Sequence, residues 1–143
     1  RTAIGVRGIR LADKDRVVSL IVADSGDPIL TATEKGYGKR TQLDEYRAQA
    51  RGGSGVISIK TSDRNGQVVG AIQVTDEDEM MLISDKGTLV RARAADVSII
   101  GRNTQGVTLI NIADDEALVS VAKIAETDDD EESTEEVEIN SEE

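Results

Sequence analysis

The sequence lacks several residue types on which enzymes and secreted proteins depend. It contains no cysteine and no histidine, which excludes disulfide bonds, thiolate metal sites and the usual general base and zinc ligand. No run of 18 apolar residues is present that could span a membrane. The absence of cysteine suits a cytoplasmic protein, which is the location we expect.

Aromatic residues are also scarce, with two tyrosines and no phenylalanine or tryptophan. The core must therefore consist of valine, isoleucine, leucine and alanine, without the aromatic signatures of WD40 or kelch repeats. The 143 residues suffice for one domain. Because the chain begins at Arg1 within patterned sequence, we interpret it as part of a longer polypeptide.

The net charge of -11 is concentrated at one end of the chain. Eleven of the 28 acidic residues, and no basic residue, lie between Glu126 and Glu143. The other 17 acids balance the 17 lysines and arginines of residues 1–125. Such an acidic run repels itself and has little to bury, so we expect residues 126–143 to be disordered. The tail is either solubilising or a mobile polyanion that competes for a basic surface of the same molecule.

The rest of the sequence nearly repeats itself with a period of 51 residues. The segment Ile29–Gly36 recurs as Met80–Gly87, and Arg51 falls on Arg102, without a gap. A period near 50 residues built from short apolar runs is typical of blade-repeat proteins. Each repeat of such a protein buries its core by stacking on its neighbours.

The apolar runs predict an all-β fold because they are short, rich in β-branched residues and leucine, and separated by turn residues. We expect strands at Val17–Val22, Ile29–Thr33, Val56–Lys60, Val68–Val74, Met80–Ser84, Leu89–Ala92, Val107–Ile112 and Ala117–Ile124. Gly36 and Gly87 suit the left-handed position of hairpin loops. Residues 42–49 hold at most one or two turns of helix.

We divide the chain into a partial domain of blade repeats, residues 1–125, and the acidic tail, residues 126–143. The domain starts with a repeat fragment, residues 1–16. Two full repeats follow at about 17–67 and 68–118, each expected to form its own four-stranded unit. A closing strand runs to residue 125.

Basic residues recur at matching positions of the two repeats, in the hairpin loop, on the outgoing strand and before a glycine-rich turn. They are Lys35, Lys39, Arg40 and Arg51 in the first repeat and Lys86, Arg91, Arg93 and Arg102 in the second. Repeated in consecutive units, such charges would supply phosphate partners to a bent duplex. Alternatively, they are solvated charges that discourage pairing at strand edges.

Catalysis by this segment is excluded by its side chains. A serine nucleophile would have no histidine base, and no cysteine nucleophile exists. The acids Asp76–Glu79 alternate faces in an extended chain, so we interpret them as a solvated turn rather than a metal site. Asp114–Glu116 has the same interpretation.

Several motifs resemble the C-terminal domain of bacterial DNA gyrase A subunits. They are Arg7–Leu11, Glu34–Thr41, Gly55–Lys60, Gly87–Arg91 and Gly101–Val107, in the family's order over residues 1 to about 125. The resemblance implies a six-bladed, propeller-like β-pinwheel, a disc whose basic rim wraps DNA, with this chain as its last blades plus the tail. It also implies that the wrap has positive handedness, so that strand passage introduces negative supercoils.

The resemblance also implies site residues. It adds Arg7 and Arg10 to the DNA-binding set. The turn Gln49–Gly55 is similar to the family's glycine-rich wrapping box. It keeps the box residues Gln49, Arg51, Gly52, Gly53 and Gly55, but has Ala50 and Ser54 where the box is basic.

By the same resemblance, the expected partners are double-stranded DNA, the remainder of the gyrase A polypeptide and the gyrase B subunit. The two subunits are expected to form an A2B2 assembly, and no membrane partner is expected. The segment carries no cofactor, metal or catalytic residue, and ATP and Mg²⁺ bind elsewhere in the ATP-dependent topoisomerase. Two alternatives stay open. One is the related domain of topoisomerase IV, which binds DNA with little wrapping. The other is a protein-interaction module, whose binding would be indifferent to salt.

Overall fold

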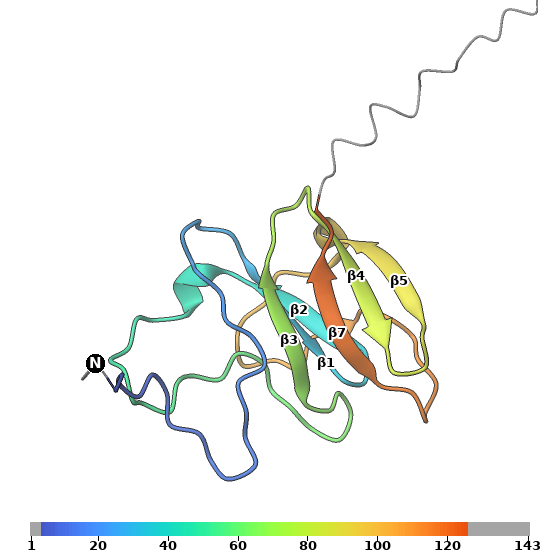
Figure 1. Ribbon diagram of the computed structural model, residues 1–143. Coiled ribbons are helices and arrows are strands. Elements are labelled where there is room, and N and C mark those ends of the chain that lie inside the picture. Colours follow the sequence, from blue (N-terminus) through green and yellow to red (C-terminus); the bar gives the residue numbers. More distant parts are fainter. Residues whose placement is uncertain (1–3, 126–143) are drawn as a thin grey trace, which may run out of the picture.

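The computed structural model describes residues 4–125 and has the predicted all-β fold (Figure 1). The strands are β1 Ile29–Thr33, β2 Tyr37–Thr41, β3 Val68–Gln73, β4 Glu79–Ser84, β5 Leu89–Arg93, β6 Val107–Thr108 and β7 Leu118–Lys123. One-turn 3-10 helices, η1 Leu43–Glu45 and η2 Ala94–Asp96, follow the hairpins β1–β2 and β4–β5. The predicted disordered tail, residues 126–143, lies outside the described residues.

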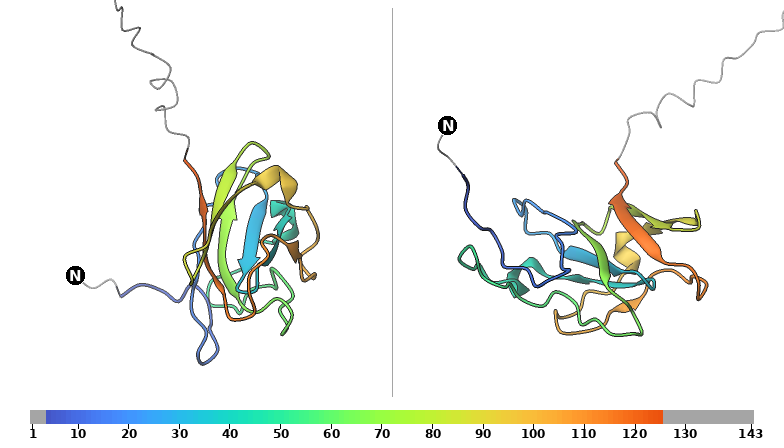
Figure 2. Two further views of the ribbon diagram at one scale, coloured as in Figure 1. Left: turned by 90° about the vertical axis from the view of Figure 1, so that its right-hand side faces the viewer. Right: turned by 60° about the horizontal axis from the view of Figure 1, so that its bottom comes forward.

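The strands form two antiparallel sheets, ordered β3-β1-β2-β6 and β5-β4-β7. The sheets meet along β3 and β7, where a Cβ atom at Gly70 would lie 3.0 Å from Val121 Cγ1. The N-terminal segment and the loop after η1 extend from one side of the sheets (Figures 1 and 2). Within residues 4–125, no helix has the length and apolar character needed to cross a bilayer.

The 51-residue period is a structural repeat. Leu30 pairs with Arg40 in the first hairpin, and Met81 pairs with Arg91 in the second, so each partner is displaced by 51 residues. Where each hairpin pairs with a further strand, the register shifts between Ala32 and Thr33 in β1 and between Ile83 and Ser84 in β4, again 51 residues apart. The 3-10 helix after each hairpin recurs at the same offset. The two copies therefore share their register as well as their sequence pattern.

The sheets do not follow the repeat boundaries. Strand β3, which opens the predicted second repeat, pairs with β1 of the first, and β6 pairs with β2. The four-stranded sheet thus takes two strands from each repeat. The expectation that each repeat forms its own four-stranded unit is wrong, because neighbouring repeats exchange strands. The boundaries 17–67 and 68–118 describe a sequence period and stay a prediction.

Two predicted strands are missing, and a third is short. Residues 17–22 and 56–60 form no strand, and of Val107–Ile112 only β6 does. By the 51-residue offset, 17–22 corresponds to β3 and 56–57 to β6, and both of those strands pair with a hairpin lying earlier in the chain. Among residues 4–125 neither segment has such a hairpin beside it, so neither forms a ladder. Leu20 is accordingly 91% exposed.

The core is aliphatic, as the composition requires, and joins the two sheets. One cluster contains Leu30 of β1 and Met80 of β4, both fully buried. A second contains Ala32 of β1, Leu82 of β4 and Leu118 of β7, also fully buried. Burying one large aliphatic side chain contributes about 1.5–3 kcal/mol. Because each cluster draws on both sheets, the sheets form one packed body.

Candidate nucleic-acid interface

The glycine-rich turn Gln49–Gly55 lies against the N-terminal segment. Gly52 and Gly55 have φ values of 82° and 81°, a conformation that glycine adopts without strain. The Arg10 main-chain N–H donates to the Gly53 carbonyl (2.8 Å), and the Gly52 N–H donates to the Gly8 carbonyl (2.9 Å). These two hydrogen bonds bring Arg7 and Arg10 beside the turn that carries Arg51.

Two further arginines border the same loop. Arg47 lines a groove with Arg51 and Gly53. Arg102 reaches the loop from the second repeat, because its guanidinium donates to the Ile57 carbonyl (2.8 Å). We call Arg7, Arg10, Arg47, Arg51 and Arg102 the arginine face. Within residues 4–125 none of the five forms an ion pair.

Arg47 was missed by the sequence reasoning. The search for recurring charges excluded it because its equivalent 51 residues later is Ser98. The signal that could have identified it was its place in the sequence, between Tyr46 and the glycine-rich turn that carries Arg51. The side chain is exposed, so its guanidinium is open to an external anion.

Lys39 lies inside the fold, and its predicted place on a basic surface is wrong. The residue is fully buried, and its Nζ donates to the carbonyls of Gly101 (2.5 Å) and Arg102 (2.7 Å) and to Thr104 Oγ1 (3.0 Å). Burial lowers the pKa of the Lys39 amine to about 8, against the opposing charge of Glu45, and Arg102 lowers it further.

Arg40 is also buried, with 5% of the residue exposed. Its Nη1 pairs with the Asp76 carboxylate at 2.5 Å, and its Nε donates to the Val97 carbonyl at 2.8 Å. The reason is the exchange between repeats: Ser98 and Ile100 bind the Arg40 main chain and cover this side of β2. The alternation of side chains along a strand does not show whether a later segment of the chain will cover them.

The remaining recurring basic residues are exposed, but their side chains bind groups of the protein itself. Lys86 pairs with Asp115, Arg91 with Glu79, and Arg93 Nε lies 3.6 Å from Asp96 Oδ2. As predicted from strand parity, Arg91 and Arg93 share the exposed face of β5.

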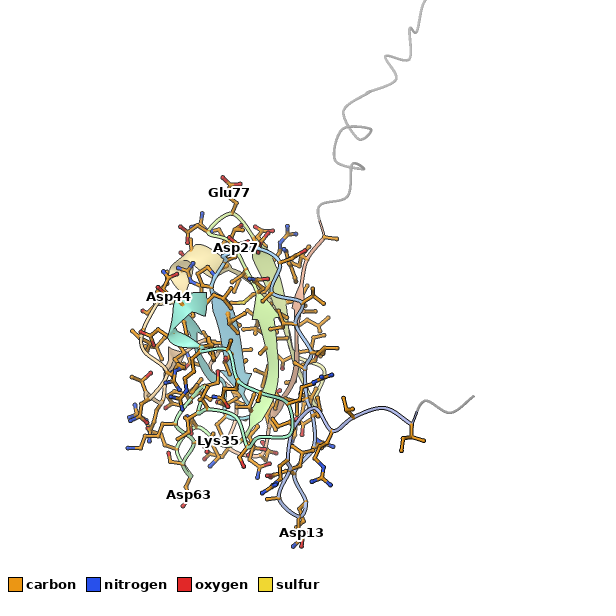
Figure 3. The ribbon with its side chains drawn as sticks, turned by 90° about the vertical axis from the view of Figure 1, so that its left-hand side faces the viewer. Asp13, Asp27, Lys35, Asp44, Asp63 and Glu77 are labelled. Atoms are coloured by element: carbon orange, nitrogen blue, oxygen red, sulfur yellow. The ribbon has the colours of Figure 1, made fainter. Side chains whose placement is uncertain are left out.

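Lys35 donates to the Asp63 carbonyl. Figure 3 shows Lys35 and Asp63 at one end of the molecule and Asp44, in η1, toward the other. Because Lys39 and Arg40 are buried, the recurring basic residues do not form one exposed band.

Three of the four carboxylates of the acidic turn Asp76–Glu79 bind partners within the protein. Besides Asp76 with Arg40, Asp78 accepts from the Thr75 N–H (2.7 Å) and pairs with Lys123 (3.1 Å). Burial acts to raise the pKa of Asp78, but hydrogen bonds from Thr75 and Lys123 together hold it below the usual value. Within residues 4–125, no group of three or more acids is placed to hold a metal ion.

Comparison with known proteins agrees with this fold. The family model described as "DNA gyrase C-terminal domain, beta-propeller" matches residues 1–24, 27–75 and 78–125. The chain is 58% identical over 132 residues to the DNA gyrase A protein of Salmonella typhimurium, and 60% identical over 132 residues to that of Klebsiella oxytoca. Each match covers 92% of this chain but only 15% of the relative.

Solved structures show the same architecture. A DNA gyrase A C-terminal domain superposes with a TM-score of 0.79 at 33% identity, over 85% of this chain and 41% of that one. A topoisomerase IV C-terminal domain gives 0.76 at 24% identity, over 84% of this chain and 38% of that one, which shows the fold alone. The resemblance found in the motifs and the partial β-pinwheel are thereby confirmed. The chain belongs to the family of DNA gyrase C-terminal, β-propeller domains.

Proposed function

We propose that this chain is a DNA-binding and DNA-wrapping module of a type II topoisomerase of the gyrase A kind, and that it carries no catalytic group itself. The observation that carries the proposal is the arginine face, where five arginine residues lie around one loop and form no ion pair among residues 4–125. Family membership and the names of the relatives support DNA as the ligand.

Phosphate is the chemistry that this face suits. A guanidinium presents five N–H donors and binds phosphate oxygens in pairs, so Arg102 keeps donors available beyond the one used by Ile57. Contacts of this kind bind the DNA backbone without reading its sequence. We therefore expect affinity that varies strongly with salt and little with base sequence.

Wrapping requires a rigid surface that repeats. The strand exchange joins the two repeats and the shared core joins the two sheets into one packed body, so a duplex bound across several repeats would have to bend to follow them. In this proposal further repeats continue the surface, and the bend directs negative supercoiling. The whole gyrase A polypeptide would work with a gyrase B subunit in an A2B2 assembly in the cytoplasm, and ATP and Mg²⁺ would bind outside this segment.

The proposal is tested by a salt-titrated duplex-binding assay on the 143-residue chain. The variant Arg7→Ala/Arg10→Ala/Arg51→Ala should bind more weakly and flatten the slope of log affinity against log salt by about 0.9 for each phosphate that it no longer neutralises. The matched control is Lys86→Ala/Arg91→Ala/Arg93→Ala, which changes the net charge equally but removes paired side chains.

The control should leave the slope nearly unchanged. Equal slopes for both variants would show that only net charge matters. Absence of DNA binding at low salt, combined with salt-indifferent capture of a protein partner, would favour the protein-interaction module instead.

A further inference from the structure

The main chain of Arg102 is held by two charged side chains of the preceding repeat. Its N–H donates to Glu45 Oε2 at 3.1 Å, and its carbonyl accepts from Lys39 Nζ at 2.7 Å. Glu45 belongs to η1 and Lys39 to β2, so both ends of this residue are fixed by the first hairpin and the turn after it. Hydrogen bonds with a charged partner are the stronger kind.

Lys39 also holds the residues on either side of Arg102. Its Nζ donates to the Gly101 carbonyl and to Thr104 Oγ1, and Thr104 Oγ1 in turn donates to the Gly101 carbonyl at 2.9 Å. The ammonium therefore organises the turn of residues 101–104 as a unit. Among residues 4–125 no carboxylate forms an ion pair with it, so its bonding capacity is directed to this turn.

The hairpin itself does not require a lysine at this place. The equivalent residue 51 positions later is Val90 of β5, in a hairpin with the same register. Burying an ammonium carries a desolvation penalty that an aliphatic side chain does not have. The lysine is therefore explained by what it binds, the turn that carries Arg102, rather than by formation of the strand.

We propose that Lys39 is a positioning residue of the arginine face, which binds the main-chain carbonyls of the 101–104 turn and so places the Arg102 guanidinium where it meets a DNA phosphate. This proposal rests on the proposed DNA-binding function. Lys39 acts through Arg102 and does not itself touch DNA, because its side chain is fully buried.

A double-mutant cycle on the 143-residue chain tests this role. Arg102→Ala should weaken duplex binding by about tenfold, equivalent to about 1.4 kcal/mol, and lower the salt slope by about 0.9. Lys39→Met should cause a loss of similar size and the same change in slope. The double variant should be no weaker than Arg102→Ala alone, because Lys39 has no other route to the DNA.

Two further variants separate positioning from charge and from folding. Lys60→Met removes the same charge from an exposed lysine whose main-chain N–H bonds the Thr104 carbonyl. It should have a much smaller effect than Lys39→Met. Thr104→Val removes one acceptor of Lys39 without changing any charge, and should weaken binding only when Arg102 is present. If Lys39→Met does not fold, the cycle of Thr104→Val with Arg102→Ala decides the question.

Losses that add in the double variant, or an equal loss from Lys60→Met, would overturn the proposal. Amide hydrogen exchange of residues 101–106 without DNA separates its failure from that of the function. Faster exchange in Lys39→Met, in a chain that binds no DNA, would contradict the DNA-binding function and leave Lys39 as a clamp of the turn only. Unchanged exchange would overturn the clamp as well.

Discussion

At the residue scale, the same arginine position has two environments. Arg40 and Arg91 are equivalent in the repeat, but the Arg40 side chain is 6% exposed and that of Arg91 is 63% exposed. The Arg40 guanidinium bonds the Val97 carbonyl as well as Asp76, whereas that of Arg91 bonds Glu79. The second repeat covers β2, while among residues 4–125 no strand pairs with the outer edge of β5.

This difference predicts unequal effects on stability. Arg40→Met should lower the free energy of unfolding by about 1.5–3 kcal/mol, because a buried carbonyl loses a charged donor. Arg91→Met should cost at most about 1 kcal/mol, since it removes an exposed ion pair. Urea denaturation followed by circular dichroism measures both values, and equal losses would show that the cover over Arg40 contributes nothing.

Lys39 predicts a pH dependence of stability. The folded state lowers the pKa of its amine from 10.5 to about 8, so between these values the unfolded chain binds more protons. The contribution of this group is therefore present above pH 10.5 and is lost as pH falls through 8. The free energy of unfolding of the chain, minus that of Lys39→Met, should rise from pH 7 to 10.5. A flat difference would mean that Lys39 titrates normally.

At the scale of elements, the two hairpin turns share a backbone shape but not a neighbourhood. Gly36 and Gly87 have φ values of 85° and 84°. A Cβ atom at Gly36 would lie 2.5 Å from the Ile110 carbonyl oxygen, whereas one at Gly87 would meet nothing within 4 Å. The first turn is packed against the second repeat, and the second turn is open.

Alanine at these two turns should therefore have different costs. Gly87→Ala should lower stability by about 1–2 kcal/mol, the cost of a left-handed conformation with a Cβ atom. Gly36→Ala should cost clearly more, because the main chain at Ile110 must also move. Thermal unfolding of both variants tests this ranking, and equal melting temperatures would contradict the packing of the repeats.

The strands were predictable where they coincide with a short apolar run whose ladder partner lies within the chain. The apolar runs located β1, β3, β4, β5 and β7, but not β2, whose sequence YGKRT contains no apolar run although β1 and β6 both pair with it. The same reasoning failed at residues 17–22, which have the pattern of a strand but form no ladder among residues 4–125. The site was predictable only in part, because burial of Lys39 and Arg40 depends on a segment about 60 residues later, which local patterns do not show.

At the scale of the whole molecule, the regions of the surface differ in whether their basic residues are paired with acids. Acids and bases balance over residues 1–125, yet the ion pairs other than that of the buried Arg40 lie on and around β4 and β5, and the arginine face lies around the loop after η1. A neutral body can thus present one surface that attracts polyanions. The fold brings Arg7 and Arg102, which are 95 positions apart, to the same loop.

Bending of a short duplex by the 143-residue chain tests the central claim most directly. A duplex with a dye at each end reports bending as energy transfer between its ends. The account predicts increased transfer with the unaltered chain and with Lys86→Ala/Arg91→Ala/Arg93→Ala, and no increase with Arg7→Ala/Arg10→Ala/Arg51→Ala at matched occupancy of the duplex. Transfer that persists in the arginine-face variant, or that disappears in the control instead, would contradict the account.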